Sequence, residues 1–303
     1  MLIIRINGGI GNQLFLYSFY VWCKSVHEDV LIERSVYDQE KIHSGWTLNK
    51  IIADEDFEKI SYKKWEETFG KPSIIKKICM RFFDHYRGHY FERYFKDLNE
   101  VKKWVKNIKK DEIIALEGYW QYSNIAEPVA YAIRQKAFRD IEKYIGERNR
   151  FYIAEMQETR SISVHVRMGD YLANAHSKKL YGNICTSKYY QTCIREIEDK
   201  YKDIPHTYFV FSDDMDNAEK LLSDLPNKVL ITENTGENAF IDMYLMTQCK
   251  DHVLANSSFS WWGCMLSNND GMIFMPKVWV NTQPYNRLAI NGAILIDSKG
   301  MHC

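Results

Sequence analysis

The chain has no net charge, because its 303 residues include 40 lysines and arginines against 40 aspartates and glutamates. A general nucleic-acid binder usually shows a strong basic excess, so we expect no nucleic-acid partner. The composition, with 46% hydrophobic and 26% charged residues, is that of an ordinary globular protein. A chain of this length has room for two domains of ordinary size.

Cysteine pairs and targeting segments are also lacking. The seven cysteines are scattered and include no C-x-x-C pair, so we expect no disulfide framework and no zinc cage. Residues 1–5 lack the basic start and long apolar run of a signal peptide. No stretch is apolar for long enough to span a bilayer. We therefore expect a cytoplasmic protein, with peripheral contact at the inner membrane face as an open alternative.

The first part of the chain has the order of a parallel α/β unit. Leu2–Ile6 is a compact apolar strand, and Gly8–Gln13 is a glycine loop. Leu14–Val26 is typical of a buried helix, and Val30–Ile32 of a second strand. The order strand, glycine loop, helix, strand predicts parallel neighbours in one sheet.

A second α/β pattern begins at Ser161. The expected strands are the short apolar runs at 162–166, 208–211, 228–231 and 253–255. The expected helices lie at 187–201, 217–223, 239–248 and 261–267, after a longer one at 128–158 that breaks near Gly146. We place the domain boundary before this second pattern, which gives domains at 1–158 and 159–303.

Residues 71–110 form a basic and aromatic segment, in which 12 lysines and arginines face only four acids. Two interpretations stay open. The segment could consist of solvated amphipathic helices, as charge runs usually do. Alternatively, it could contact anionic lipid headgroups or a lipid-linked substrate.

Polar residues follow the apolar run Ser161–Val164, at the point where a strand would end. His165, Arg167 and Asp170 stand in this segment. In open α/β sheets ligands bind at that edge, and the planar fork of an arginine suits phosphate. The alternative is structural, with Arg167 and Asp170 forming a loop ion pair and His165 packed in the strand.

The N-terminal glycine loop needs a comparison with dinucleotide sites. Gly9 and Gly11 resemble the start of that fingerprint, and Glu33 stands near the place of its ribose-binding acid. The third glycine of the fingerprint is missing, which disfavours a nicotinamide cofactor. The loop still presents Asn12 and Gln13, whose amides suit hydroxyls or phosphate. Asn12 could instead cap the helix.

Acids end the apolar strand within residues 208–216, and three interpretations stay open. Asp214 and Asp216 could be the metal-binding pair of a manganese-dependent sugar transferase. Ser212 or Asp213 could cap the next helix. One carboxylate, from Asp213 or Asp214, could accept the N–H pair of a guanine edge.

The last motif, residues 253–263, is a buried strand that leads into Asn256, Ser257, Ser258 and Phe259 ahead of an apolar helix. Hydroxyl groups and backbone N–H groups at a helix start make an anion site. A plain serine N-cap is the alternative, and both could hold together.

Three motifs in one order, at residues 8–13, 165–171 and 257–263, resemble the α-1,2-fucosyltransferases of glycosyltransferase family 11, in a bacterial form. The resemblance spans Met1 to about Pro276. It implies an α/β, GT-B-like fold, in which two Rossmann-like domains face a cleft. It also implies inverting transfer of L-fucose from GDP-fucose to the 2-hydroxyl of a terminal galactose, with no cofactor and no obligatory metal. The alternative is another nucleotide sugar, with a metal at Asp214 and Asp216.

The resemblance also implies roles for residues. In the C-terminal domain, the donor-binding residues would be His165, Arg167, Asp213, Asp214, Asn256, Ser257, Ser258 and Phe259. In the N-terminal domain, the fucose and the acceptor would meet Gly9, Gly11, Asn12 and Gln13. The residues expected to take part in catalysis are Arg167, Asn12 and Asp170, the last as a base or as an orienting group for Arg167. The acceptor would be a galactose-terminated oligosaccharide of a surface glycan, free or lipid-linked. Packing of the extreme C-terminus back on the first domain stays open.

Overall fold

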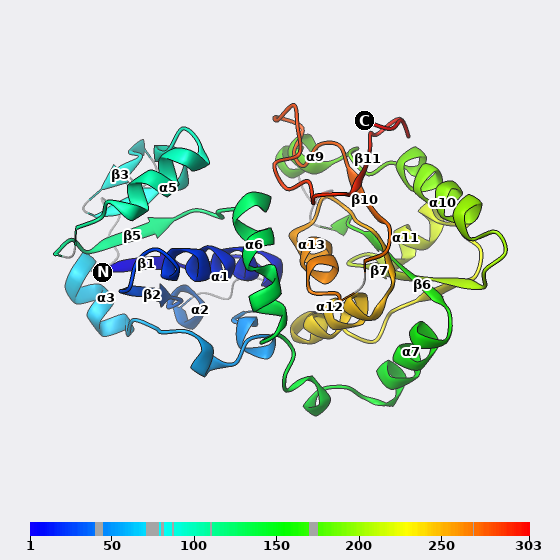
Figure 1. The fold of residues 1–303 in the computed structure, drawn as a ribbon, viewed down its shortest axis with the longest axis horizontal. Coiled ribbons are helices and arrows are strands. Elements are labelled where there is room, and N and C mark those ends of the chain that lie inside the picture. Colours follow the sequence, from blue (N-terminus) through cyan, green and yellow to red (C-terminus); the bar gives the residue numbers. More distant parts are fainter. Residues whose placement is uncertain are drawn as a thin grey trace. The chain divides into compact units, whose positions relative to one another are not determined.

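The computed structural model describes residues 1–39, 45–70, 79, 82–86, 88–109, 111–169, 175–268 and 270–303. The chain divides into two compact units, Met1–Ala137 and Phe138–Cys303, and each is built on its own sheet (Figure 1). The predicted base, Asp170, lies outside the described residues.

The first unit is a mixed sheet with helices. Its strands are β1 (Leu2–Arg5), β2 (Val30–Glu33), β3 (His85–Tyr86), β4 (His89–Phe91) and β5 (Ile114–Glu117). Its helices are α1 (Ile10–Lys24), α2 (Val36–Gln39), α3 (Tyr62–Phe69), α5 (Leu98–Lys106) and α6 (Ser123–Arg134). The sheet order is β2-β1-β5-β4-β3, with only the β3–β4 pair antiparallel. Helices α1 and α6 pack together (Figure 1). Trp65 and Phe69 of α3 pack on Ile3 and Ala115 of the sheet.

The second unit is a parallel doubly wound sheet. Its strands are β6 (Arg160–Val166), β7 (His206–Ser212), β8 (Lys228–Leu230), β9 (Asp251–Val253), β10 (Ile273–Pro276) and β11 (Ile294–Ile296). Its helices are α7 (Glu147–Glu158), α9 (Ala175–Tyr181), α10 (Ser187–Tyr201), α11 (Met215–Leu221), α12 (Ala239–Gln248) and α13 (Ser258–Met265). The order β11-β10-β9-β6-β7-β8 reverses its direction between β6 and β9. Ligands of such sheets bind at this switch point, outside the carboxyl ends of the strands.

Helices cover both faces of the second sheet, which explains its apolar strands. Tyr189 and Tyr190 of α10 join one core cluster with Val164. Tyr152 and Met156 of α7 join another core cluster, which also contains residues of β7 and α12. Helix α7 therefore packs in the second unit, although the sequence led us to place the boundary after it, at residue 158. The functional roles of the two domains stay predictions.

Helix boundaries differ from those expected. Helix α1 begins at Ile10, so Asn12 and Gln13 lie inside its first turn. The break expected near Gly146 in the helix over 128–158 is confirmed, since α7 begins at Glu147 with Gly146 as its N-cap, but the break is longer than expected because α6 already ends at Arg134. The residues between them form turns and a short 3-10 helix.

The basic segment 71–110 is described only in part. Within it, α5 buries Leu98, Val101 and Val105. Lys103 and Lys106 lie in its last turn, where positive charge stabilises a helix end. This part therefore fits an amphipathic helix, while membrane contact stays a prediction. No helix in the described part of the chain has the length and apolar character needed to cross a bilayer.

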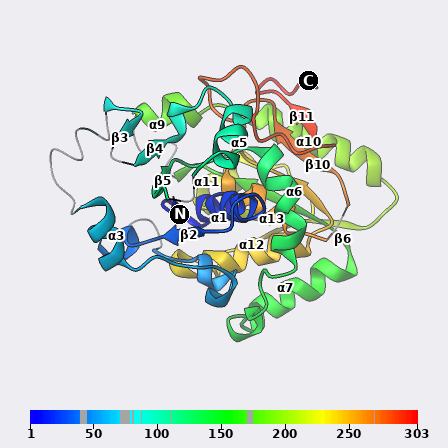
Figure 2. The ribbon, with the colours of Figure 1, turned by 60° about the vertical axis from the view of Figure 1, so that its left-hand side comes forward.

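The C-terminal residues lie beside α10 of the second unit (Figure 2). The Thr192 hydroxyl donates to the Gly300 carbonyl at 3.0 Å, and the Thr186 hydroxyl donates to the Ser298 carbonyl at 2.6 Å. These two bonds hold the C-terminal tail to the second unit. Packing of the tail on the first domain had been considered from the sequence.

Candidate active site

The second and third motifs meet at the switch point of the second sheet. Strands β6 and β9 are neighbours, with Val164 in register with Val253, so the segments that follow them leave the same edge. The rings of His165 and Phe259 lie 5.6 Å apart between centroids. The fold therefore brings together two of the motifs that lie far apart in the sequence.

Asp213, at the end of the neighbouring strand β7, contacts the segment after β6. Its Oδ2 atom lies 3.3 Å from Nε of Arg167 and accepts from the Gly169 N–H at 3.0 Å. Its Oδ1 atom accepts from the Met168 N–H at 2.9 Å. The carboxylate of Asp213 is therefore bonded to this loop, and its predicted contact with guanine stays a prediction.

His165 is a buried, neutral ring. It is 3% exposed, and its Nδ1 atom has no hydrogen-bond partner within the described ranges. Burial, reinforced by the nearby charge of Arg167, lowers the pKa of His165 to about 3. The imidazole therefore carries no charge at neutral pH, and it can hydrogen-bond a ligand without repelling the arginine beside it.

The start of α13 is shaped by Asn256 and Ser257. Ser257 is the N-cap, and its hydroxyl oxygen accepts from the Phe259 N–H at 3.3 Å. The amide of Asn256 is buried and donates to the carbonyls of Tyr181 and Trp279. The predicted serine cap is therefore confirmed. Ser258 is the first residue of α13, and Phe259, the next residue, is the one whose ring contacts His165. Backbone N–H groups at such a start favour an anion.

Asp214 caps α11, where Ser212 or Asp213 had been expected. Its carboxylate accepts from the backbone N–H of Asn217 at 3.2 Å and from the Asn217 side chain at 2.8 Å. The expected caps were wrong by one or two residues, because Ser212 instead accepts from the Asp214 N–H.

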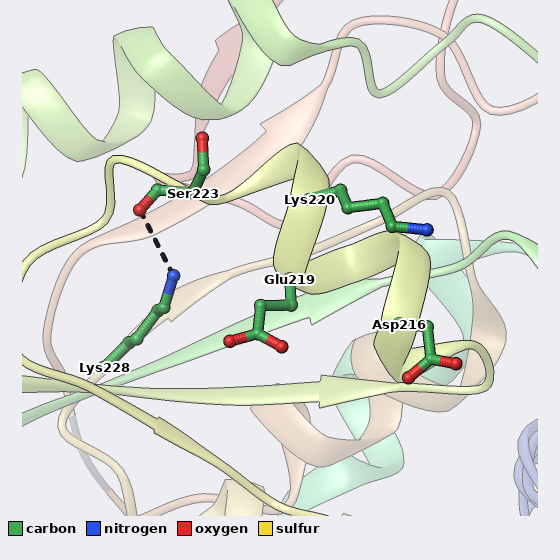
Figure 3. Close-up of a pocket in the computed structure, with 5 residues that line it drawn as sticks. All are labelled: Asp216, Glu219, Lys220, Ser223 and Lys228. Atoms are coloured by element: carbon green, nitrogen blue, oxygen red, sulfur yellow. Dashed lines mark hydrogen bonds between the residues drawn. The ribbon is translucent and has the colours of Figure 1, made fainter.

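Asp216 lies in a surface pocket with both signs of charge. Its neighbours there are Glu219 and Lys220 on α11, Ser223 after the end of α11, and Lys228 at the start of β8 (Figure 3). Lys228 donates to the carbonyl of Ser223 at 3.3 Å. Among the described residues, no group of three or more His, Cys, Asp or Glu side chains could hold a metal ion. The Asp214–Asp216 metal pair stays an untested alternative.

In the first unit, the loops after β1 and β5 meet at Asn12. Gly8 has φ +79°, and a Cβ there would lie 2.8 Å from Nδ2 of Asn12, so the turn requires glycine. Gly9 is the N-cap of α1 and has no side-chain cap bond, so the capping role considered for Asn12 is not observed. The Oδ1 atom of Asn12 accepts from Nε2 of Gln121 at 2.8 Å.

The buried side chain of Gln13 holds the glycine loop by a hydrogen bond to its backbone. It is fully buried, and its Nε2 atom donates to the carbonyls of Gly8 and Gly45. Its Oε1 atom accepts from the backbone N–H groups of Thr47 and Leu48 at 3.1 and 2.8 Å. Gly11 is buried in the same first turn of α1. These positions support the loop, and their predicted contact with fucose or acceptor stays a prediction.

A charged cluster at the edge of the first sheet was missed from the sequence. Arg5 pairs with Glu33 at 3.1 Å and with Glu117 at 3.4 Å. Nδ1 of His89 lies 2.5 Å from Oε1 of Glu117. Burial raises the pKa of Glu117, but the His89 hydrogen bond and the Arg5 charge outweigh it and lower the pKa overall. Arg5, Glu33 and Glu117 each end an apolar strand, which is the signal that could have found them.

The family model of glycosyl transferase family 11 matches residues 2–291. The chain belongs to this family. An α-1,2-colitosyltransferase of Escherichia coli is 29% identical over 304 residues, which cover 94% of each chain. The O-antigen biosynthesis glycosyltransferase WbnK of Escherichia coli is 25% identical, covering 95% of this chain and 98% of that one. The chain is therefore a glycosyltransferase, as the resemblance implied.

Solved structures agree on the fold. The fucosyltransferase NodZ from Bradyrhizobium has a TM-score of 0.54 at 16% identity, over 88% of this chain and 92% of that one. NodZ α-1,6-fucosyltransferase co-crystallised with GDP has a TM-score of 0.51 at 17% identity, with the same coverage. The predicted α/β, GT-B-like fold class is confirmed by this likeness and by the two units, each built on a wholly or mainly parallel sheet with helices.

Proposed function

We propose that the protein transfers L-fucose from GDP-fucose to the 2-hydroxyl of a terminal galactose, with inversion at the sugar carbon. The observation that carries the proposal is the contact of His165 with Phe259, at the start of α13, at the switch point, with Arg167 two residues after His165 on the same segment. This is the edge at which doubly wound sheets bind nucleotides.

The donor side has the chemistry to stabilise a departing nucleoside diphosphate. Charge develops on the β-phosphate as the glycosidic bond breaks. The guanidinium of Arg167 and the backbone N–H groups at the start of α13 suit that charge. NodZ, a fucosyltransferase of the same fold, was co-crystallised with GDP, which supports the choice of nucleotide. These groups could stabilise the leaving GDP without an obligatory metal.

The acceptor side of the proposal lies in the first unit. Asn12 and Gln121 form an amide pair at the edge of its sheet, where amides can donate to and accept from sugar hydroxyls. Inversion needs one displacement and a base near the acceptor hydroxyl. Asp170 remains our proposed base, with orientation of Arg167 as its alternative role. The acceptor is a galactose-terminated glycan, and its lipid-linked form fits the O-antigen role of the relative WbnK.

A second donor is favoured by the α-1,2-colitosyltransferase, which is 29% identical to this chain. Colitose is L-fucose without its 3-hydroxyl. A site that hydrogen-bonds this hydroxyl would reject the deoxy sugar by about 10⁴- to 10⁵-fold, since its own polar groups would be left unpaired. An enzyme for colitose would place an apolar surface at the 3-position of the sugar, and it would discriminate far less between the GDP-linked forms of colitose and L-fucose.

The experiment is release of GDP from GDP-fucose and, separately, from GDP-colitose, with and without lactose, in EDTA. Lactose-stimulated release from GDP-fucose, with an α-1,2 linkage in the product by NMR, is the expected result. Preference for GDP-colitose would select the second donor. Release only after Mn²⁺ is added, or only with another nucleotide sugar, would overturn the proposal in favour of the Asp214–Asp216 alternative.

A further inference from the structure

Three groups from the segment after β6 converge on one carboxylate. The N–H groups of Met168 and Gly169 donate to the two oxygens of Asp213, and Nε of Arg167 lies beside Oδ2. Hydrogen bonds to a charged acceptor are stronger than neutral ones. One side chain, directly after the end of β7, therefore contacts both the backbone of this loop and Nε of Arg167.

Asp213 is itself firmly placed. Strand β7 pairs with β6 over their whole length, so Ser212 stands in register with Val166, directly before the two segments diverge. The next residue, Asp214, caps α11 and fixes the chain on the other side. The carboxylate is therefore anchored by a strand end and a helix start, and it can impose its position on the loop.

Gly169 allows the close approach. A Cβ at this position would lie 2.7 Å from Oδ2 of Asp213, which is closer than real Cβ contacts. The backbone φ of Gly169 is not positive, so the need for glycine here comes from the contact with Asp213 and not from backbone strain. Any side chain at 169 would push the loop away from Asp213.

We propose that Asp213 is a positioning residue that locks the β6 loop and aims the guanidinium of Arg167 at the donor phosphates. The proposal rests on the phosphate role of Arg167 in the proposed function. The ion pair at Nε, 3.3 Å from Oδ2 of Asp213, restrains one end of the guanidinium, and the opposite end carries the two Nη groups used in bidentate phosphate binding. In this proposal Asp213 acts on the donor phosphates through Arg167.

The first test is Asp213→Asn, which keeps the shape but replaces one acceptor oxygen by an NH2 group, so that a donor faces one of the loop N–H donors. We expect GDP affinity and kcat/KM for GDP-fucose to fall together, by about 100-fold for a misplacement near 1 Å. The matched control is Asp224→Asn, an exposed acid of the same unit, which should leave both values unchanged.

A double-mutant cycle distinguishes positioning of Arg167 by Asp213 from a purely structural role of Asp213. The quantity measured is the GDP Kd, by calorimetry. If Asp213 acts through Arg167, Asp213→Asn should weaken GDP binding strongly in the wild-type background and hardly at all beside Arg167→Ala. Equal losses in the two backgrounds would overturn the proposal.

A second cycle tests the contact itself. Gly169→Ala should weaken GDP binding in the wild-type background, because the new methyl group displaces the carboxylate. In the Asp213→Ala background the space is empty, so Gly169→Ala should add almost no further loss. A Gly169→Ala enzyme with the wild-type GDP Kd would contradict the lock.

Failure of this inference can be told from failure of the proposed function. A wild-type protein that binds GDP and uses GDP-fucose, together with an unaffected Asp213→Asn variant, would overturn the lock alone. A wild-type protein that neither binds GDP nor turns over GDP-fucose would overturn the proposed function, and the inference with it.

Discussion

Gln121, in the segment after β5, donates a hydrogen bond of 2.8 Å to Asn12, in the first turn of the helix α1 that follows β1. The two strands are neighbours in the first sheet, so the bond spans the edge at which they end. Donation by Gln121 sets the direction of the Asn12 amide, with its oxygen toward Gln121. This relationship gives the acceptor side of the proposed function a defined polar group.

Gln121→Ala should raise the KM for lactose by about tenfold, in line with the loss of one hydrogen bond of about 1.4 kcal/mol, and leave the GDP Kd unchanged. The reason is that Asn12 loses the partner that sets its orientation, while the donor residues lie in the second unit. Initial rates at varied lactose and calorimetry with GDP give the two values. The exposed Gln157→Ala is the control, and a raised GDP Kd in Gln121→Ala would argue against an acceptor role.

Arg167→Ala should lower kcat by about 10²- to 10³-fold, the loss typical of one group that stabilises developing negative charge. Arg167→Lys should recover only part of it, since the charge is kept but the planar fork is lost. Single-turnover rates with GDP-fucose measure both variants against Arg195→Ala, an exposed arginine on α10. Near-normal turnover in Arg167→Ala would remove the phosphate role.

Sequence patterns predicted the strand ends but not which of them are neighbours. The apolar runs of the second unit were found because both sheet faces are covered, and their polar ends indicated the candidate site at Arg167 and Ser257. The bond from Asp213 to the Arg167 loop was missed, because it depends on the pairing of β6 with β7 and on the space at Gly169.

The same limit applies to Gln121 and to helix boundaries. Gln121 lies far from Asn12 in the sequence, and only the pairing of β1 with β5 brings them together. Leu14 was expected to start a helix that begins at Ile10, because a glycine in a first turn resembles a loop residue until its packing is known.

Lowering the pH should destabilise the fold partly through His252. Burial lowers the pKa of this histidine to about 4, below its usual value, and its Nδ1 lies 2.8 Å from the Ser163 hydroxyl. The unfolded chain binds the proton first, so the stability is complete above about pH 6.5 and is lost as the pH falls toward 4.

Replacement of His252 by Asn should therefore flatten the pH dependence of the free energy of unfolding between pH 6 and 4. The largest change for one such group is about 1.4 kcal/mol per pH unit. Urea unfolding at several pH values measures the slope, with His176→Asn as an exposed control. An unchanged slope in His252→Asn would show that this ring is not a source of the acid sensitivity.

Asp251→Ala should destabilise the second unit by about 3 kcal/mol, because it breaks a buried ion pair and leaves its donors unpaired. Asp251 is fully buried and accepts from Arg160 at 2.5 and 2.7 Å, from the Tyr201 hydroxyl and from the Met272 N–H. The value is at the lower end for such pairs, since the Arg160 side chain stays 28% exposed to water. Glu142→Ala removes a surface pair with Arg150 and should cost about 1 kcal/mol or less. Urea denaturation at pH 7 gives the free energy of unfolding of both variants. Similar decreases in Asp251→Ala and Glu142→Ala would mean that the buried ion pair stabilises the fold no more than the surface pair does.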